Sequence, residues 1–280
     1  MKLLTKKQLL TALLLSFITS VGFAQHILPA ANVEAILYTG NTENQPLVVG
    51  LGGSEGGNAW AGDHWKKVRD GFLERGYAFL AIGYFGCKET PELLDKIAIE
   101  DVYRAVGIAK KYEKIDSSKI IIIGGSRGAD LALLIGSYYK DISAVIGMSA
   151  SHAVFPGHTQ EFNTSCWTFG GEELPFIPVN EEAIPFLMNR DLRGAFEAML
   201  KDTLAEQKAI IKIEKINGSI LLLSAIEDEI IPAVTMGEKM ILRLKNNHFK
   251  HLYKHIIYKG NHAEPTKHFD IIFDFLESIR

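Results

Sequence analysis

The chain has 280 residues, of which 47% are apolar, and this is enough to bury one sizeable core. The formal net charge is −3 at pH 7. Because a mildly acidic chain has no basic excess for phosphate groups, its charge excludes a nucleic-acid-binding protein. The two cysteines, Cys87 and Cys166, are too few for a disulfide framework, and the sequence leaves their pairing open.

Residues 1–24 have the pattern of a secretory signal peptide. The basic start "MKLLTKKQ" precedes the uncharged run "LLTALLLSFITSVGFA", in which Gly22 and Ala24 are the small residues that a signal peptidase reads. At about 16 residues, the run is shorter than the roughly 20 that span a bilayer, although a retained anchor is the alternative. We therefore expect export to the periplasm or the medium, no stable membrane span after cleavage, and one domain over residues 25–280.

Strands and helices alternate along residues 25–150. Segments such as "YAFLAIGYF" and "KIIIIG" are apolar at every position or nearly so, which is typical of strands that are buried on both faces. The sequence thus predicts an α/β fold with a mostly parallel sheet flanked by helices. The predicted strands lie near Val33–Tyr38, Leu47–Leu51, Tyr77–Phe85, 119–124 and Ile142–Ala150, and the predicted helices at Asn58–Arg75, Pro91–Tyr112 and Arg127–Tyr139.

Residues 152–217 interrupt this alternation, and we expect them to form a lid-like insertion above the carboxyl edge of the sheet. Helical pieces are predicted near Glu181–Met188 and Leu192–Ala209. The alternation resumes with the strand in "SILLLSAIEDEIIP", a helix over Ala233–Lys245, the strand "LYKHIIYKG" and a last helix over Thr266–Ile279. Six aromatic residues of the insertion either line an acyl or aromatic pocket or pack the insertion onto the sheet: Phe155, Phe162, Trp167, Phe169, Phe176 and Phe186.

The segment "GGSRG", residues 124–128, matches G-x-S-x-G between a buried strand and a helix. A serine hydroxyl is a poor nucleophile unless a base activates it, and a sharp turn at a strand end holds Ser126 exposed and fixed for this purpose. The residues that a phosphate-binding loop or a dinucleotide-binding fingerprint requires are absent, so we expect no nucleotide cofactor. The pattern predicts that Ser126 is a nucleophile.

In a fold with this turn, the acid and then the histidine follow the serine along the chain. Asp228 comes directly after the next-but-one strand, four residues before Pro232, and it is the predicted acid, with Glu227 and Glu229 as alternatives. His262 lies in the loop after the last strand and is the predicted base.

The glycine-rich stretch "LGGSEGG" follows an early strand and suits an oxyanion hole. We expect the backbone N–H groups of Ser54 and Arg127 to be the two donors, with Glu55 as the alternative to Ser54. His152 alone is no ligand set, so we expect neither a metal nor another cofactor.

Taken together, "LGGSEGG", "GGSRGADLAL", "CWTFGGEELPFIP", "AIEDEIIP" and "GNHAEP" resemble the α/β-hydrolase domain that acyl-CoA thioesterases share with bile-acid-CoA:amino-acid N-acyltransferases, and more distantly dienelactone hydrolases. The resemblance covers about residues 45 to 280. It implies the α/β-hydrolase fold and a serine or cysteine triad acting on acyl thioesters, carried here by Ser126, Asp228 and His262. The acyltransferase branch uses cysteine at the nucleophile position, so Ser126 favours hydrolysis.

The resulting hypothesis is an exported serine hydrolase that cleaves a small-molecule acyl ester or thioester through an acyl-enzyme. A secreted peptidase or amidase on the same scaffold, an acyltransferase using the same acyl-enzyme, and a non-catalytic binding protein are the alternatives. The sequence carries no signal for an oligomeric state.

Overall fold

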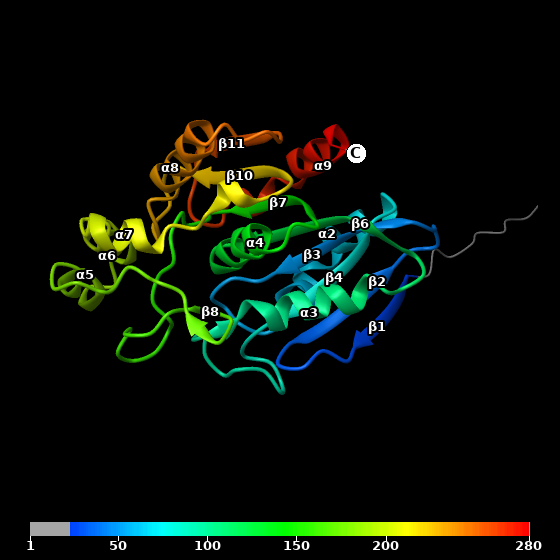
Figure 1. Ribbon diagram of the computed structural model, residues 1–280, viewed down its shortest axis with the longest axis horizontal. Helices are drawn as coiled ribbons and strands as arrows, with labels where there is room; N and C mark the ends of the chain where they lie inside the picture. The colour runs from blue at the N-terminus through cyan, green and yellow to red at the C-terminus, as the bar shows by residue number, and fades with distance from the viewer. Residues whose placement is uncertain (1–22, 280) are drawn as a thin grey trace, which may run out of the picture.

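The computed structural model describes residues 23–279 (Figure 1). A sheet of eight strands runs through the molecule in the order β1-β2-β4-β3-β6-β7-β10-β11. The pairs β1–β2 and β2–β4 are antiparallel, and the other neighbouring pairs are parallel. The strands are β1 (Ala24–Leu28), β2 (Glu34–Thr39), β3 (Gln45–Leu51), β4 (Ala78–Gly83), β6 (Ile115–Gly125), β7 (Ile142–Met148), β10 (Ser219–Ala225) and β11 (Tyr253–Tyr258).

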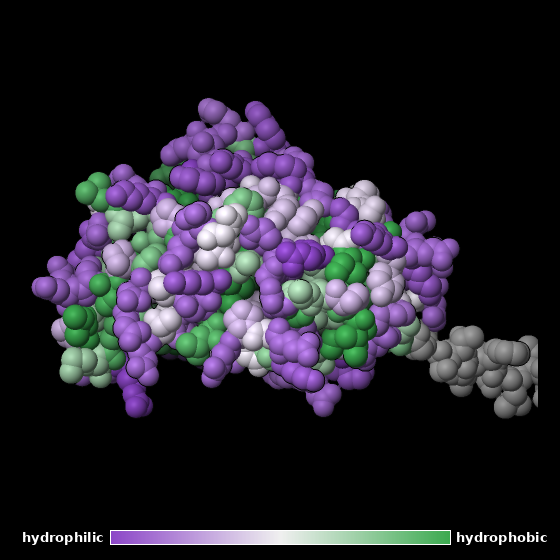
Figure 2. Space-filling model, turned by 60° about the horizontal axis from the view of Figure 1, so that its bottom comes forward, coloured by the Kyte–Doolittle hydropathy of each residue, from purple (hydrophilic) through white to green (hydrophobic). Residues whose placement is uncertain are grey.

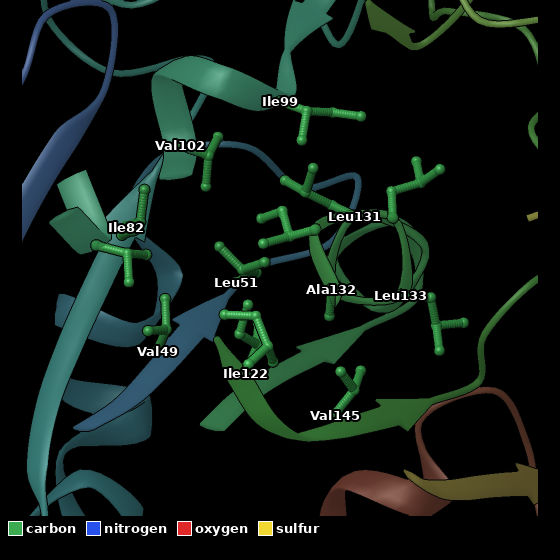
Figure 3. Close-up of a cluster of buried hydrophobic side chains, with 14 of the residues drawn as sticks. Val49, Leu51, Ile82, Ile99, Val102, Ile122, Leu131, Ala132, Leu133 and Val145 are labelled. Carbon is green, nitrogen blue, oxygen red and sulfur yellow. The ribbon is translucent and has the colours of Figure 1, made fainter. Parts of the chain in front are cut away.

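Helices cover both faces of this sheet. One face carries α3 (Ile99–Ala109), α4 (Arg127–Tyr138) and α8 (Ala233–Asn246), and the other carries α2 (Asp63–Glu74) and α9 (Phe269–Ser278). Neighbouring strand residues contribute to opposite cores: Val49 and Ile122 pack under α3 and α4, as Figure 3 shows, whereas Val48 and Ile121 belong to the core under α2 and α9. This two-sided burial explains the unbroken apolar runs, and the predicted mostly parallel, helix-flanked sheet is confirmed.

The segment between β7 and β10 forms the predicted interruption. It contains α5 (Ile184–Met188), α6 (Leu192–Met199), α7 (Thr203–Ala209) and the short strands β8 (Trp167–Phe169) and β9 (Glu172–Glu173). Its own apolar core joins Phe155 and Met199 to Met236 of α8. The helices α5, α6 and α7 lie at the left end of the molecule in Figure 1, and hydrophobic residues reach the surface at that end in Figure 2.

Two predicted helices are wrong in extent. The helix predicted over Pro91–Tyr112 is formed only from Ile99 to Ala109, because the chain before it turns at Lys96 (φ 51°) and pairs as β5 (Ile97–Ala98) with β8. The helix predicted over Leu192–Ala209 is split into α6 and α7, since Asp202 caps α7 by accepting the N–H of Ala205 at 2.9 Å. Both breaks depend on contacts that a periodic pattern does not encode.

The other helix ends differ less. A 3₁₀ turn, η1 (Ala59–Ala61), precedes α2, and η3 (Glu264–Lys267) precedes α9. Cys87 and Cys166 are both free thiols. The predicted signal peptide lies outside the described residues except for Phe23 and Ala24, at which β1 begins. Between residues 23 and 279, no helix combines the length and the apolar character that crossing a membrane requires.

The turn from β6 into α4 is packed directly against the end of β3. A Cβ atom added to Gly128 would lie 2.2 Å from the carbonyl oxygen of Gly52 and 2.5 Å from that of Leu51. A Cβ atom added to Gly124 would lie 2.1 Å from the carbonyl oxygen of Gly128. Because these neighbours are backbone atoms, they cannot rotate away, and only glycine permits the approach.

We predict that Gly128→Ala lowers the free energy of unfolding by about 2 kcal/mol or more, because the new methyl group forces two backbone segments apart. Urea unfolding followed by circular dichroism measures the change. Gly107→Ala is the matched control: Gly107 lies in α3 with no atom within 4 Å of an added Cβ, so it should raise stability by roughly 0.5–1 kcal/mol. Equal effects of the two substitutions would contradict the argument.

Candidate active site

Ser126 occupies the turn between β6 and α4 in a backbone conformation that L-residues rarely adopt, with φ 53° and ψ −125°. Its N–H donates to the carbonyl oxygen of Met148 at 2.8 Å, which ties the turn to the end of β7. The residue is partly exposed, and its side chain lines a cavity at the carboxyl edge of the sheet. The strained turn therefore holds the hydroxyl at a fixed, accessible position.

Asp228 and His262 form a hydrogen-bonded pair at the same edge. The carboxylate oxygens Oδ1 and Oδ2 of Asp228 lie 2.9 and 2.8 Å from Nδ1 of His262. Asp228 is fully buried, and its Oδ1 also accepts the N–H groups of Ile230 at 2.9 Å and Ile231 at 3.0 Å. These bonds leave the carboxylate one orientation, which fixes the imidazole in turn.

The two alternative acids have other surroundings. Glu229 accepts the backbone N–H of His262 at 3.0 Å through Oε2, so it steadies the loop rather than the ring. Glu227 is exposed, and its backbone N–H donates to the carbonyl oxygen of Gly260. The structure thus brings Asp228, of the three, to the imidazole.

Ser126 and His262 face the same cavity, which has a volume of about 530 Å³, and both also line a smaller cavity of about 160 Å³ beside Trp60 and Trp65. Within residues 23–279 no hydrogen bond joins the two side chains. A serine–histidine contact of this kind commonly tightens only once substrate is bound. The larger cavity is lined mainly by apolar side chains, among them Val179, Leu187, Leu192, Phe196, Met199 and Ile231.

The loop after β3 lies against Ser126, because a Cβ atom added to Gly53 would come within 3.1 Å of the Cβ of Ser126. Two hydrogen bonds fix this loop: the Tyr84 hydroxyl donates to the carbonyl oxygen of Gly52 at 2.6 Å, and the Glu55 carboxylate accepts the N–H of Gly53 at 3.0 Å. Tyr84 was not singled out from the sequence; its position at the end of an apolar strand was the available signal.

The two predicted oxyanion donors are free to bind a ligand. Over the described part of the chain, the N–H groups of Ser54 and Arg127 make no hydrogen bond, and the same holds for the N–H of Glu55, the alternative donor. The N–H of Gly53, by contrast, is occupied by the Glu55 side chain. Both predicted donors belong to residues that line the cavity with Ser126.

Arg127 is also one of the residues that line this cavity. Its Nη1 donates to Asp130 Oδ2 at 3.1 Å, and its guanidinium carbon lies 5.4 Å from the ring centroids of both Phe155 and Phe196. Burial raises the pKa of Asp130 to about 6 against the opposing effect of Arg127. Asp130 Oδ1 also accepts the N–H of Ser151 at 2.7 Å.

Of the six aromatic residues of the insertion that the sequence indicated, only Phe162 lines the larger cavity. Phe155 and Trp167 are fully buried, and Phe169 stacks on Tyr138, so these three pack the insertion onto the rest of the protein. Phe176 and Phe186 are absent from the lining as well. Phe196 lines the cavity although the sequence did not single it out; its place on the amphipathic helix α6 was the only signal.

A polar contact ties the insertion to α8, and a second one holds the start of the insertion to α7. His152 Nε2 lies 2.5 Å from Glu206 Oε1 of α7, and Lys239 of α8 binds the same carboxylate oxygen. His152 does not line the cavity. In residues 23–279 no three His, Cys, Asp or Glu side chains are grouped so that they could hold a metal ion.

This fold, with a serine at a strand–helix turn and a bonded carboxylate–histidine pair at the same edge, is that of the α/β hydrolases. Residues 99–264 match the family described as "BAAT / Acyl-CoA thioester hydrolase C terminal". Because the match covers more than half of the chain, the protein belongs to this family, and the predicted resemblance is confirmed.

The relatives agree with this assignment. Acyl-coenzyme A thioesterase 1 of Rattus norvegicus is 26% identical over 155 residues, which cover 55% of this chain and 34% of the relative. Acyl-coenzyme A amino acid N-acyltransferase 1 of Mus musculus is 24% identical over 172 residues, covering 61% and 38%. The matches thus span little more than a third of these relatives. An esterase of Pyrococcus furiosus superposes with a TM-score of 0.59 at 16% identity, covering 99% of this chain and 95% of the esterase.

His158 lines the cavity near Arg127, and it provides a test of the burial of this site. Burial, assisted by the charge of Arg127, lowers the pKa of His158 from 6.5 to about 4. The unfolded chain therefore binds a proton at His158 below pH 6.5, whereas the folded protein does so only near pH 4, so the folded state loses stability as the pH falls through this window.

We predict that His158→Gln reduces the loss of unfolding free energy between pH 7 and pH 5 by about 1 kcal/mol, a value discounted for partial solvent exposure. Urea unfolding at pH 5, 6 and 7 measures the difference from the wild type. Gln160→Ala, at an exposed position nearby and without a titratable group, is the control and should leave the pH dependence as it is. Identical pH profiles for the wild type and His158→Gln would contradict the burial of His158.

Proposed function

We propose that the protein is a serine hydrolase that cleaves an acyl ester or thioester through an acyl-enzyme. The observation that carries the proposal is the hydrogen bond of buried Asp228 to His262, whose ring shares one cavity with Ser126 and with two free backbone N–H groups. These parts are what acyl transfer requires: a nucleophile, an oriented base and donors for the oxyanion.

In the proposed mechanism, the Ser126 hydroxyl attacks the acyl carbon while Nε2 of His262 takes its proton. Asp228 holds Nδ1–H and stabilises the imidazolium that forms. The N–H groups of Ser54 and Arg127 donate to the oxyanion of the tetrahedral intermediate. His262 then gives its proton to the leaving alcohol or thiol, and water hydrolyses the acyl-enzyme by the reverse sequence.

The larger cavity supports an acyl substrate of moderate size. Its volume of about 530 Å³ lies in the range of small-molecule sites, and its mainly apolar lining suits a hydrocarbon chain. Among the relatives are acyl-coenzyme A thioesterases, and the esterase of Pyrococcus furiosus shares the fold, so esters and thioesters are the substrates to test.

Acyl transfer to an amine is the second candidate. It is favoured by the similarity to an N-acyltransferase and by the Glu55 carboxylate, which lines the cavity and offers a partner for an ammonium group. Hydrolysis and aminolysis share the acyl-enzyme, so product analysis with and without added glycine distinguishes them.

The pattern of residues 1–24 supports a further proposal, that the chain is exported and that the domain begins at residue 25. We also propose that residues 152–217 act as a lid, because Phe162, Leu187 and Phe196 of this segment are among the residues that line the cavity. N-terminal sequencing of the protein recovered from a periplasmic or culture-medium fraction tests the export.

We predict that Ser126→Ala abolishes labelling by a fluorophosphonate probe and lowers kcat for p-nitrophenyl esters by roughly 10³-fold or more, because the nucleophile is lost. Asp228→Asn should lower kcat by about 10²- to 10⁴-fold, because the imidazole loses the partner that fixes its tautomer. Labelling gels and steady-state kinetics measure the effects.

The matched control is Ser143→Ala on β7, where the hydroxyl donates to the carbonyl oxygen of Ile120 outside the cavity. This variant should keep both labelling and activity. Full labelling of the Ser126→Ala protein would end the proposal.

A further inference from the structure

A guanidinium group lies in the wall of an otherwise mainly apolar cavity without enough protein acceptors. Arg127 is only 8% exposed and lines the cavity with Ser126. A guanidinium has five N–H donors, and over residues 23–279 this one makes a single hydrogen bond, from Nη1 to Asp130. The protein does not fully enclose any Arg127 guanidinium nitrogen that lacks a partner. The remaining N–H donors are therefore accessible from the cavity or the solvent.

His158 adds a second polar group to this wall. Its ring makes no hydrogen bond within the described chain, and neither ring nitrogen is fully enclosed. The charge of Arg127 contributes to the lowered pKa of His158, so the two groups are electrostatically coupled. At neutral pH His158 is therefore an uncharged imidazole, which can donate one hydrogen bond beside the permanent charge of Arg127.

Two carboxylates face the same cavity, and neither satisfies these donors. Asp130 accepts one bond from Arg127 and one from the N–H of Ser151. Glu55 is exposed, and its Oε1 is bonded to the N–H of Gly53. The free donors of Arg127 and His158 thus lack an acceptor from the protein, and they remain available to an acceptor that enters the cavity.

We infer that Arg127 and His158 form a subsite for a carboxylate at the far end of the acyl group, so that the enzyme prefers half-esters or half-thioesters of short dicarboxylic acids. This inference rests on the proposed hydrolase function, since it names the acyl class of the same cavity. A carboxylate matches the guanidinium because its two oxygens accept parallel N–H donors, and such charge-assisted bonds are stronger than neutral ones. The apolar residues that line the same cavity would pack against the methylene groups of such an acyl chain.

The competing explanation is purely structural. Arg127 lies against Phe155 and Phe196 of the insertion and pairs with Asp130 on its own helix, so its side chain also helps to seat the insertion. Loss of a structural role would lower activity toward every ester alike. Loss of a carboxylate subsite would lower activity toward acidic esters selectively, and the ratio between substrates separates the two.

The test compares p-nitrophenyl half-esters of the four- to eight-carbon dicarboxylic acids with their ω-methyl esters, which have the same chain but no charge. For the best chain length, the wild type should cleave the acidic ester with a kcat/KM about 10- to 100-fold above that of the methyl ester, the effect of one or two charge-assisted bonds. Arg127→Met should abolish this preference, and Arg127→Lys should keep part of it because a point charge remains.

Arg243→Gln is the matched control, since Arg243 pairs with Glu214 outside the cavity and its loss should leave the preference unchanged. If Arg127→Met does not fold, the wild-type series decides together with inhibition by free adipate, which should be competitive. Equal kcat/KM values for acidic and methyl esters in the wild type, or an equal loss on both in Arg127→Met, would overturn the inference.

Failure of this inference is distinguishable from failure of the proposed function. Cleavage of the neutral esters that depends on Ser126 but shows no preference for a carboxylate removes the subsite alone. Absence of Ser126-dependent cleavage of any ester, with no fluorophosphonate labelling, removes the hydrolase function and the subsite with it.

Discussion

The close approach of two backbone segments at the carboxyl edge of the sheet is the constraint on which the site depends. Gly128 at the start of α4 lies against the carbonyl oxygens of Leu51 and Gly52, so the turn that carries Ser126 cannot move away from the loop that follows β3. That contact brings the serine, the free N–H of Ser54 and the free N–H of Arg127 to one cavity wall. The strands β3 and β6, which lead into these two segments, pair with each other in the sheet. The same strand pairing therefore stabilises the sheet and positions the candidate oxyanion hole.

The carboxylate–histidine half of the site comes from the last two strands of the sheet. The strands β10 and β11 are parallel neighbours, so their carboxyl ends deliver Asp228 and His262 to the same edge, and the two residues bond there. The Asp228 carboxylate also accepts two backbone N–H groups of its own loop. These bonds fix the orientation of the carboxylate toward the imidazole. Residues of the insertion line one side of the cavity, and Glu206 of the insertion binds Lys239 of α8, which attaches this segment to the helix that follows the Asp228 loop.

Arg127 contributes to both the turn that carries Ser126 and the contact with the insertion. Its backbone N–H makes no hydrogen bond over the described residues. Its side chain contacts Phe155 and Phe196 of the insertion, and it lines the cavity with donors that no protein acceptor meets. One residue thus links the predicted chemistry to the inferred choice of acyl group. The pair with Asp130 has a physical cost, because burial pulls the carboxyl toward its neutral form. The charge of Arg127 and the N–H of Ser151 offset part of this cost.

The sequence by itself determined the layered sheet and the three residues at its edge, because apolar runs, strand–helix order and the G-x-S-x-G turn are local or periodic signals. Ser126, Asp228 and His262 were named from their places after particular strands, and parallel strands bring such places together. Tertiary structure alone decided where the helix after Pro91 begins, because β5 pairs with β8 some 70 residues further along the chain. It also decided which aromatic residues line the cavity, with Phe196 in the lining and Trp167 buried, and it decided that Tyr84 anchors the loop after β3. These outcomes depend on contacts between distant segments, for which a single sequence has no periodic signature.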